Sequence, residues 1–357
     1  MKYTAAIAHI RQLCSLGLGG QVIMPALLQA LHSIVPSHAN VFTWTDENGE
    51  MTNVCFEELV RPEVVALCLA ALYDKEEDQV RPKLSEGTRA SDGVANFGPG
   101  VGRLCYPSAL CDSTRSPSEP HVALRAIVRA NGCSLGALML CREHGDPPFT
   151  QDEEQALSTV TRYLARGLKN NRDIRGPYAD GGESGLIVLD AENKIAYGSA
   201  SGRHLLFLAA HPLIAPGSIM PSDDTILTPG IAQLCQNLGD VFSGGDAPVA
   251  SWCHQNAWGR FVFRAYPLQT GEQSANPLTG ITVERQEPLP LRMMRTMQAL
   301  ALSPKQKEIC LLLSYGYSHA TISKRLNITQ HTVTDHVQKI YAKLKVNTRE
   351  TLLSKLH

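Results

Sequence analysis

Several features that would assign a sequence to a class are missing from this chain of 357 residues. No apolar run approaches the roughly 18 residues that a membrane-spanning helix needs. Residues 1–14 lack the apolar core of a secretion signal and are better interpreted as an amphipathic helix. We therefore expect a cytoplasmic protein with no membrane partner.

Cysteine is not scarce, but paired cysteine spacing is missing. The ten cysteines are scattered, with no C-x-x-C motif and no paired Cys/His spacing. Such a pattern predicts no metal site and is typical of reduced thiols in a cytoplasm. We expect most of these residues to act as small buried hydrophobic side chains, with a thiol sensor as the alternative.

Signatures of catalysis are missing as well. The glycine-rich segments 17–20 and 98–102 neither open a helix after a strong strand nor contain Gly-Lys-Ser/Thr, which argues against nucleotide-binding loops. The twelve histidines are dispersed, and a haem ligand such as His204 or His211 is the alternative to ordinary surface or core histidines. No nucleophile, base and orienting group share a local signature. We predict no enzyme activity and identify no cofactor.

What the chain does have is a strong charge asymmetry. Residues 302–357 contain nine Lys and Arg but only three acids (Glu308, Asp335 and Glu350), which gives a formal charge of +6. Because the whole chain carries −1, residues 1–301 carry about −7 by difference. A small basic unit next to an acidic region is typical of a nucleic-acid-binding module, since neutralising phosphates dominates DNA affinity.

The basic C-terminal segment also contains the start and stop signals of four short helices. Ser303, Pro304 and Gln306 predict a capping box at the start of the first helix, and Gly316 ends it where a positive φ is needed. A second helix is predicted at 320–326, with a tight turn after it. Each later helix has a hydroxyl residue at its start, and these residues are Ser318, Thr329 and Thr348.

The third of these helices has two distinct faces. Its apolar stripe recurs with helical spacing and consists of Val333, Val337, Ile340, Tyr341 and Leu344. Its opposite face is polar and basic and consists of Gln330, His331, Thr332, Thr334, Asp335, Gln338, Lys339 and Lys343. Two short helices joined by a tight turn, the second with a polar outer face, predict a helix-turn-helix. A small helical bundle with a solvated surface is the alternative.

Residues 302–353 resemble the C-terminal helix-turn-helix of the LuxR/NarL transcription-factor family. The residues that match in order and spacing are Leu302, Ser303, Pro304, Glu308, Gly316, Ile322, Leu326, Ile328, Thr332, Val333, His336, Val337, Ile340, Lys343, Leu344, Val346 and Arg349. The resemblance implies that the third helix enters the major groove of double-stranded DNA. It also implies that the fourth helix carries a dimer contact.

The base-reading residues implied by this resemblance are Thr334, Asp335 and Gln338. Family members usually have lysine at the position of Thr334 and often a basic residue at that of Gln338, so this surface carries less charge. Asp can accept from cytosine N4, and Gln can pair with adenine. Phosphate contacts position the helix without reading sequence. The residues suited to such contacts are Lys324, Thr329, Gln330, Thr332, Lys339 and Lys343.

Residues 1–171 combine helices and strands. Strands around two hairpin turns are predicted at 41–45, 51–56, 122–128 and 134–141. The segment 75–120 is interpreted as long loops. The strand at 135–138, Phe149, Thr150 and the long helix that follows resemble a GAF domain. This resemblance implies a sensory α/β module with a small-molecule pocket, or one that has lost its ligand and serves as a dimer scaffold.

Residues 183–286 follow a segment at 172–182 that we interpret as a linker. Strands are predicted at 185–190, 194–197, 261–266 and 280–284, with a helix that contains Leu205, Leu206 and Leu208. The first hairpin and helix resemble the start of a PAS domain, although Ser199 or Ala200 stands where that family usually has Asn. A joining helix at 287–301 leads into the helix-turn-helix.

The sequence thus predicts multidomain α/β (α+β) sensor modules, GAF-like and PAS-like, followed by an all-α four-helix helix-turn-helix. We expect a DNA-binding transcriptional regulator that acts as a homodimer. Its expected partners are double-stranded DNA, RNA polymerase and a small-molecule effector. The first alternative is a ligand-binding or protein-interaction scaffold whose helix-turn-helix binds DNA weakly, because its outer face carries little charge. The second is an enzyme with a regulatory DNA-binding tail.

Overall fold

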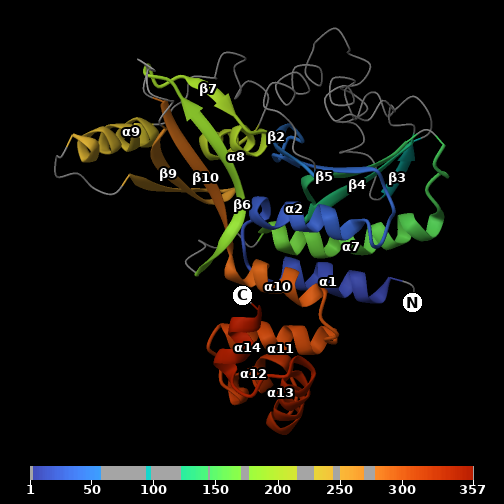
Figure 1. Cartoon of the computed structure of the whole chain (residues 1–357). Coiled ribbons are helices and arrows are strands. Elements are labelled where there is room, and N and C mark those ends of the chain that lie inside the picture. The colour runs from blue at the N-terminus through green and yellow to red at the C-terminus, as the bar shows by residue number, and fades with distance from the viewer. Residues whose placement is uncertain are drawn as a thin grey trace.

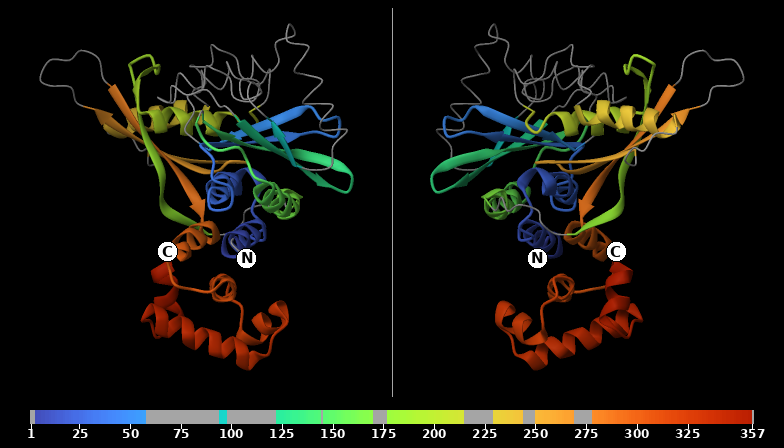
Figure 2. Two further views of the ribbon diagram at one scale, coloured as in Figure 1. Left: turned by 90° about the vertical axis from the view of Figure 1, so that its right-hand side faces the viewer. Right: turned by 90° about the vertical axis from the view of Figure 1, so that its left-hand side faces the viewer.

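Two α/β modules and a helical C-terminal domain make up the computed structural model (Figure 1). The residues it describes are 3–57, 94–97, 122–143, 145–169, 177–214, 229–243, 250–268 and 278–356. Figure 2 shows the two sheets side by side, with the C-terminal domain below them.

Among the residues described, the first module consists of an antiparallel sheet and three helices. Its strands are β1 (Ala39–Thr45), β2 (Met51–Phe56), β3 (Val94–Phe97), β4 (Val122–Ala130) and β5 (Cys133–Arg142), in the order β2-β1-β5-β4-β3. Its helices are α1 (Thr4–Cys14), α2 (Gly20–Leu31) and α7 (Gln151–Lys169). Both predicted hairpins are confirmed, with Gly49 (φ 86°) and Asn131 (φ 54°) in the left-handed conformation that their tight turns require.

A buried ion pair joins α7 to this sheet. Arg142 Nη2 donates to Glu153 Oε1 at 2.7 Å, and the two residues are only 5% and 8% exposed. The guanidinium also donates to Pro36 O at 2.8 Å and Pro147 O at 3.0 Å, while Glu153 Oε2 accepts from Thr150 N at 2.8 Å. These added bonds compensate for the loss of water around both charges, as a buried ion pair requires.

The second module repeats the strand order of the first. Its elements are β6 (Tyr178–Leu189), β7 (Ile195–Gly198), α8 (Ala200–Ala210), α9 (Pro229–Phe242), β8 (Ser251–Asn256), β9 (Gly259–Leu268) and β10 (Leu278–Pro288). The sheet is antiparallel in the order β7-β6-β10-β9-β8. When the strands of each module are numbered along the chain, both sheets have the spatial order second, first, fifth, fourth, third. The two modules therefore share one sheet topology.

Two sequence-based interpretations are wrong in part. The segment 75–120 is not all loop, because β3 lies within it and pairs with β4; the rest of that segment is outside the described residues. The segment 172–182 is not a linker from Tyr178 onward, because β6 begins there and Tyr178 pairs with Pro288 at the end of β10. In addition, α9 and β8 form in a stretch where no element is predicted. Cross-strand pairing stabilises these short or glycine-containing strands, and it leaves little trace in local sequence.

The two modules pack against each other. Asn53 Oδ1 accepts from Ile214 N at 2.9 Å across the boundary between them. Trp44 and Trp258 meet edge to face, with ring centroids 6.1 Å apart. Each contact joins one residue from the first module to one from the second, so the modules form a continuous body above the C-terminal domain (Figure 1).

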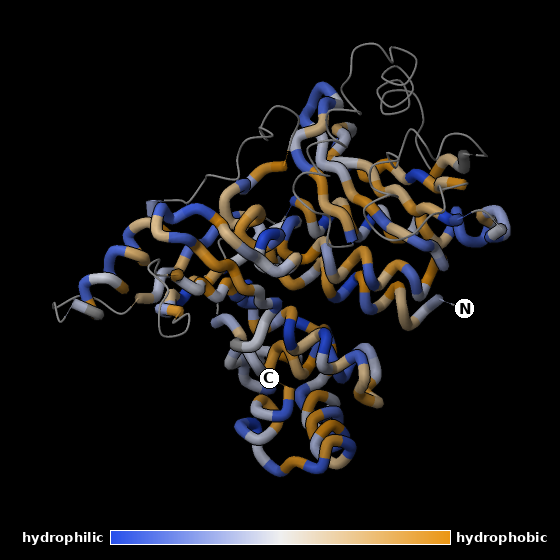
Figure 3. Tube along the Cα trace, turned by 45° about the horizontal axis from the view of Figure 1, so that its top comes forward, coloured by the Kyte–Doolittle hydropathy of each residue, from blue (hydrophilic) through white to orange (hydrophobic). Residues whose placement is uncertain are grey.

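Four helices form the C-terminal domain, as predicted. They are α11 (Pro304–Ser314), α12 (His319–Leu326), α13 (Gln330–Leu344) and α14 (Arg349–Leu356). Hydrophobic and hydrophilic residues are interspersed along them, as expected for amphipathic helices that share a small core (Figure 3). The joining helix α10 (Leu289–Gln298) follows β10 directly, and α10 and α1 lie between the sheets and this domain (Figure 1).

Candidate nucleic-acid interface and inter-module cavity

Hydrogen-bonded caps set the starts of the helices in the C-terminal domain. Ser303 Oγ accepts from Gln306 N at 3.3 Å and Gln306 Oε1 accepts from Ser303 N at 2.9 Å, which confirms the predicted capping box. The side chains of Ser318 and Thr329 cap α12 and α13. Between these two helices Asn327 adopts a left-handed conformation with φ 51°. Local sequence thus fixes the sharp turn that orients α13 against α12.

One face of α13 is polar and accessible. Val333, Val337 and Ile340 are buried on the inner face of the helix, whereas Gln338 and Lys339 are exposed on the other side. In Figure 1, α13 lies at the end of the C-terminal domain that is farthest from the two sheets. Figure 1 shows no other labelled helix or strand beyond α13 at that end of the domain.

Two of the predicted base-reading residues, Asp335 and Gln338, lie on this outer face. Thr334 lies nearer to α12, and its Oγ1 is 3.4 Å from His319 Nδ1. His331 completes the outer face, with its Nε2 3.8 Å from Asp335 Oδ2 one helical turn away. We did not predict His331 as a base-reading residue, although its spacing of four from Asp335 and seven from Gln338 marks one helix face.

The predicted phosphate-contacting residues differ in how free their side chains are. Those that are exposed and lie around α12 and α13 are Lys324, Thr329, Gln330 and Lys339, while Thr332 is half-buried. Lys343 is also exposed, but its Nζ donates to Ala301 O at 2.8 Å and to Gln306 Oε1 at 3.1 Å. It joins α13 to the start of α11, and a phosphate contact would compete with these two bonds.

The other side of the C-terminal domain packs on α1 and α10. Gln12 Nε2 donates to Pro304 O at 2.6 Å, and Gln298 Nε2 donates to His9 Nε2. Burial, together with the nearby charge of Lys307, lowers the pKa of His9 to about 4, so the ring is neutral and its nitrogen can accept. α14 packs against α10. The dimer contact expected on the fourth helix stays a prediction.

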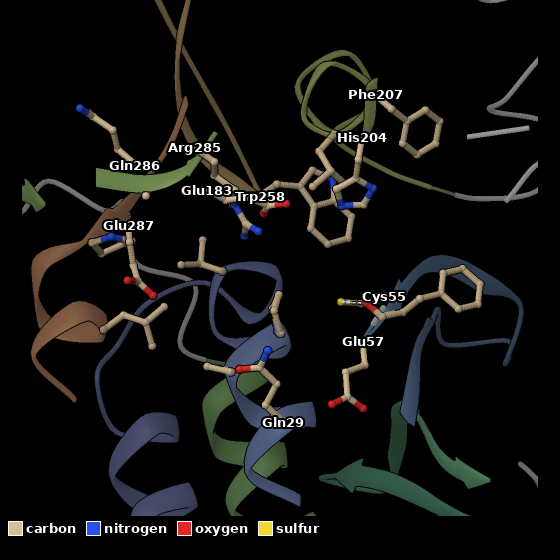
Figure 4. Close-up of a pocket in the computed structure, with 18 of the residues that line it drawn as sticks. Gln29, Cys55, Glu57, Glu183, His204, Phe207, Trp258, Arg285, Gln286 and Glu287 are labelled. Carbon is tan, nitrogen blue, oxygen red and sulfur yellow. Dashed lines mark hydrogen bonds between the residues drawn. The ribbon is translucent and has the colours of Figure 1, made fainter. Parts of the chain in front are cut away.

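A cavity of about 490 Å³ lies between the two modules (Figure 4). The first module contributes residues of α2 and β2, and the second contributes residues of β6, α8 and β10. Much of the wall is apolar and includes Val22, Pro25, Val54, Phe207, Leu208 and Trp258. Because neither module encloses this space alone, its lining could not be identified from either predicted domain.

Charged groups gather at the second module's side of this cavity. Figure 4 shows Glu183 and Arg285 close to Trp258, with Glu287 farther from Trp258 than either of them. Arg285 Nε donates to Trp258 O at 2.9 Å. Burial raises the pKa of both Glu183 and Glu287, an effect that Arg285 opposes in both. Glu287 Oε1 accepts from Arg295 Nη2 at 2.5 Å, but its buried Oε2 has no hydrogen-bond partner among the described residues.

A second cavity of about 430 Å³ extends from this region toward the C-terminal domain. It lies among α1, α2 and α10 and is lined at its far end by Lys307 of α11. Both cavities are lined by Gln29, Leu291 and Arg295. The joining helix α10 therefore contacts the space between the modules on one side and the helix-turn-helix on the other.

The described cysteines agree in part with the sequence-based expectation. Cys14, Cys55 and Cys310 are buried, and burial raises the pKa of each thiol to about 12, which disfavours reactive thiolates. Cys133 and Cys253 are instead exposed. Within the described ranges, no group of three or more His, Cys, Asp or Glu is arranged to hold a metal ion. None of the helices described there is long and apolar enough to span a bilayer.

Residues 300–355 match the family described as bacterial regulatory proteins, luxR family. The predicted helix-turn-helix is therefore confirmed as a domain similar to that family, and the match covers only this small part of the chain. No curated protein matches the chain.

Similarities to solved structures are remote. The sensor region of a sensor histidine kinase is 13% identical and aligns over 70% of this chain and 84% of its own, with a TM-score of 0.19. The ligand-binding domain of the Pseudomonas fluorescens chemoreceptor CtaA is 13% identical in complexes with L-isoleucine and L-leucine. Both complexes cover 73% of this chain and have a TM-score of 0.20; the alignments cover 75% and 77% of those chains. Such low scores support neither a fold nor a ligand for this chain.

Proposed function

We propose that this chain is a transcription regulator that binds double-stranded DNA through α13 and is controlled by its two N-terminal modules. The observation that carries the proposal is the luxR-family domain, in which the polar face of α13 is exposed. In a helix-turn-helix the second of the two helices enters the major groove and reads base edges. Here that helix is α13, which follows α12 after the turn at Asn327.

In this proposal Asp335 and Gln338 read bases, with Thr334 at the edge of the contact. Lys339, Lys324 and the hydroxyl and amide groups at the start of α13 hold phosphates, which fixes the helix in the groove. Few positive charges face the DNA, so one domain alone has modest affinity. A homodimer offsets this weakness, because two linked half-sites raise the effective concentration of the second domain. The proposed dimer includes the fourth helix, α14.

The two modules are proposed to be sensory, the first GAF-like and the second PAS-like. Both have the five-stranded antiparallel sheets with helices that such α/β modules require, and they precede one DNA-binding output along the chain. A small molecule controls DNA binding only if it binds the DNA-competent and incompetent states with different affinity. We place the protein in the cytoplasm, where DNA and RNA polymerase are its partners.

A scaffold whose helix-turn-helix binds DNA weakly is the second candidate function. It is favoured by the uncharged residues Thr334 and Gln338 at positions where the family often has basic ones. The two candidates differ in one measurable property, because only a regulator enriches a defined site from a pool of random duplexes. Selection with the full chain at low and at moderate salt should therefore yield one recurrent sequence. Failure to enrich any sequence under both conditions favours the scaffold.

Lys339 gives a sharper test on the selected site. Lys339→Ala should weaken binding to all sequences alike and reduce the slope of log affinity against log salt by about one, because one phosphate contact is lost. Lys194→Ala, which removes the same charge from the exposed turn between β6 and β7, is the matched control and should leave the slope unchanged. Equal slopes for wild type and Lys339→Ala would rule out the phosphate contact.

A further inference from the structure

The cavity between the modules has the size and lining of a small-molecule site. Its volume of about 490 Å³ lies within the range of roughly 300–1,000 Å³ that is usual for ligand pockets. Phe207 and Trp258 form part of an apolar wall, and a few charged groups converge at one end. That combination, an apolar surface with a small number of placed polar groups, is what fixes the orientation of an organic ligand.

The polar end of the cavity contains a hydrogen-bond acceptor to which none of the described residues donates. The Glu287 side chain is only 10% exposed, and one of its oxygens is bound to Arg295. The other oxygen, Oε2, is buried and has no hydrogen-bond partner among the described residues. An unmade hydrogen bond at a buried charged group is costly, so a donor that reaches Oε2 is stabilised there.

The charges at this end are balanced, so the Glu287 oxygen left unpaired among the described residues decides which ligand group is stabilised there. Arg285 lies close to Glu183 and Glu287, and its Nε is already bound to Trp258 O. Glu57, across the cavity, is bound to His32 Nε2 at 2.7 Å. Two carboxylates, Glu183 and Glu287, therefore meet two guanidinium groups in the lining, those of Arg285 and Arg295. Burial still raises the pKa of both carboxyls, although nearby arginines oppose this effect. A positively charged ligand would stabilise their ionised forms.

We propose that this inter-module cavity binds a small organic amine, whose ammonium group donates to Glu287 Oε2 and whose apolar body packs against Trp258, Phe207 and Leu208. Glu183 supplies a second negative charge near the ammonium. The apolar body crosses toward Pro25 and Val54, so the ligand contacts both modules at once. Binding itself does not depend on the DNA-binding function proposed above.

The effect of the amine on DNA does rest on that proposed function. Glu287 is one residue from the end of β10, and its partner Arg295 lies on α10, which packs against α11 and α14. An ammonium group at Oε2 weakens the attraction between Glu287 and Arg295, since the two cations share one carboxylate. The position of α10, and with it the helix-turn-helix, is thus coupled to the occupancy of the cavity.

Three probes with one common body test the ligand class. We would titrate the full chain with 2-phenylethylamine, phenylacetate and 2-phenylethanol and follow heat release and thermal unfolding. The amine should bind about tenfold or more tightly than the other two, because a hydrogen bond to a charged group contributes about 1.5–3 kcal/mol. Tighter binding of phenylacetate would overturn the proposal in favour of an anion site at Arg285. Absence of binding by all three probes up to millimolar concentration would also overturn it.

Variants locate the site. Glu287→Gln should lose about tenfold in amine affinity, and Glu183→Gln should lose less. Glu192→Gln, in the exposed turn between β6 and β7, is the matched control and should bind as wild type does. If Glu287→Gln fails to fold, Leu208→Met, which keeps side-chain volume, should alter amine affinity without altering Glu287. Wild-type affinity in every cavity variant that folds would contradict the site.

The DNA readout separates this proposal from the previous one. With its selected duplex, the full chain should change DNA affinity when 2-phenylethylamine is added, and Glu287→Gln should not respond. Amine binding without any change in DNA affinity would overturn the coupling and leave the amine site intact. If the full chain without amine binds no DNA, this result contradicts the proposed function but not the amine site.

Discussion

The helix-turn-helix domain and the two-module body place their functional residues in opposite ways. Asp335, Gln338 and Lys339 lie within one turn and a half of a single helix and are accessible from outside. The cavity instead collects Glu57 from the end of the first hairpin and Glu287 from the end of β10, far apart in the sequence. A surface on one helix depends on local periodicity, whereas a cavity between modules depends on how two sheets pack.

The two regions also carry net charges of opposite sign. The C-terminal domain carries +6 and the remainder about −7. The basic domain contacts the acidic body through α1 and α10, while α13 remains accessible. An acidic body near a DNA-binding face repels phosphates and reduces affinity, and this repulsion is screened by salt. We therefore expect changes inside the body to affect stability first, whereas DNA affinity responds to changes in α13 and at the junction with the body.

The largest expected effect is on the stability of the body. Arg142→Ala leaves Glu153 as a buried, unpaired carboxylate and should reduce the free energy of unfolding of the first module by about 3–5 kcal/mol. Burial opposes ionisation of Glu153, but Thr150 and Arg142 lower its pKa on balance, so wild-type stability should also fall as the pH drops through that lowered pKa. Chemical denaturation measures both effects.

Arg162→Ala, which removes a charge from the middle of α7, serves as the control for that experiment. Equal unfolding free energies for Arg142→Ala and Arg162→Ala would contradict the buried ion pair. Retention of a separate unfolding transition for the C-terminal domain in Arg142→Ala would show that the two regions fold independently.

The next effect concerns the influence of the body on DNA binding. A fragment that starts at Leu289 should bind the selected DNA more tightly than the full chain at matched oligomeric state. A coupling of about 1–3 kcal/mol is typical of such control. Gln12→Ala in the full chain, which removes the bond to Pro304 O, should change affinity in the same direction but less. Equal affinities for fragment and full chain would reduce the body to a dimer scaffold.

The C-terminal domain could be predicted from the sequence to a greater extent than the two-module body. The capping box at Ser303, the tight turn before Thr329 and the stripe on α13 depend on residues a few positions apart, and all were predicted. The start of β6 at Tyr178 depends on pairing with Pro288 more than a hundred positions away, and it was missed. The orphan oxygen of Glu287 likewise depends on the packing of both modules, so no local pattern marks it.

A smaller effect should follow from pH at the junction. Neutral His9 accepts from Gln298, and its pKa is lowered to about 4 from an ordinary value of 6.5. His9 has a lower pKa in the folded chain than in the unfolded chain, so lowering the pH favours the unfolded chain, which binds the proton more readily. The contribution of neutral His9 to stability is therefore complete above about pH 6.5 and is lost as the pH falls toward about 4. Thermal unfolding at about pH 7.5 and about pH 5 should therefore show a larger drop for wild type than for His9→Gln. Identical drops would mean that His9 does not titrate at this contact.

The most direct test of the central claim, that α13 reads DNA, is the affinity of Gln338→Ala for the selected site and for a scrambled duplex. The account predicts a loss of about 1–3 kcal/mol on the selected site, little change on the scrambled one, and relaxed preference at a single base pair. Gln255→Ala, on the exposed strand β8, should bind both duplexes as wild type does. Unchanged discrimination between the two duplexes in Gln338→Ala would contradict the proposal that this face of α13 reads the sequence.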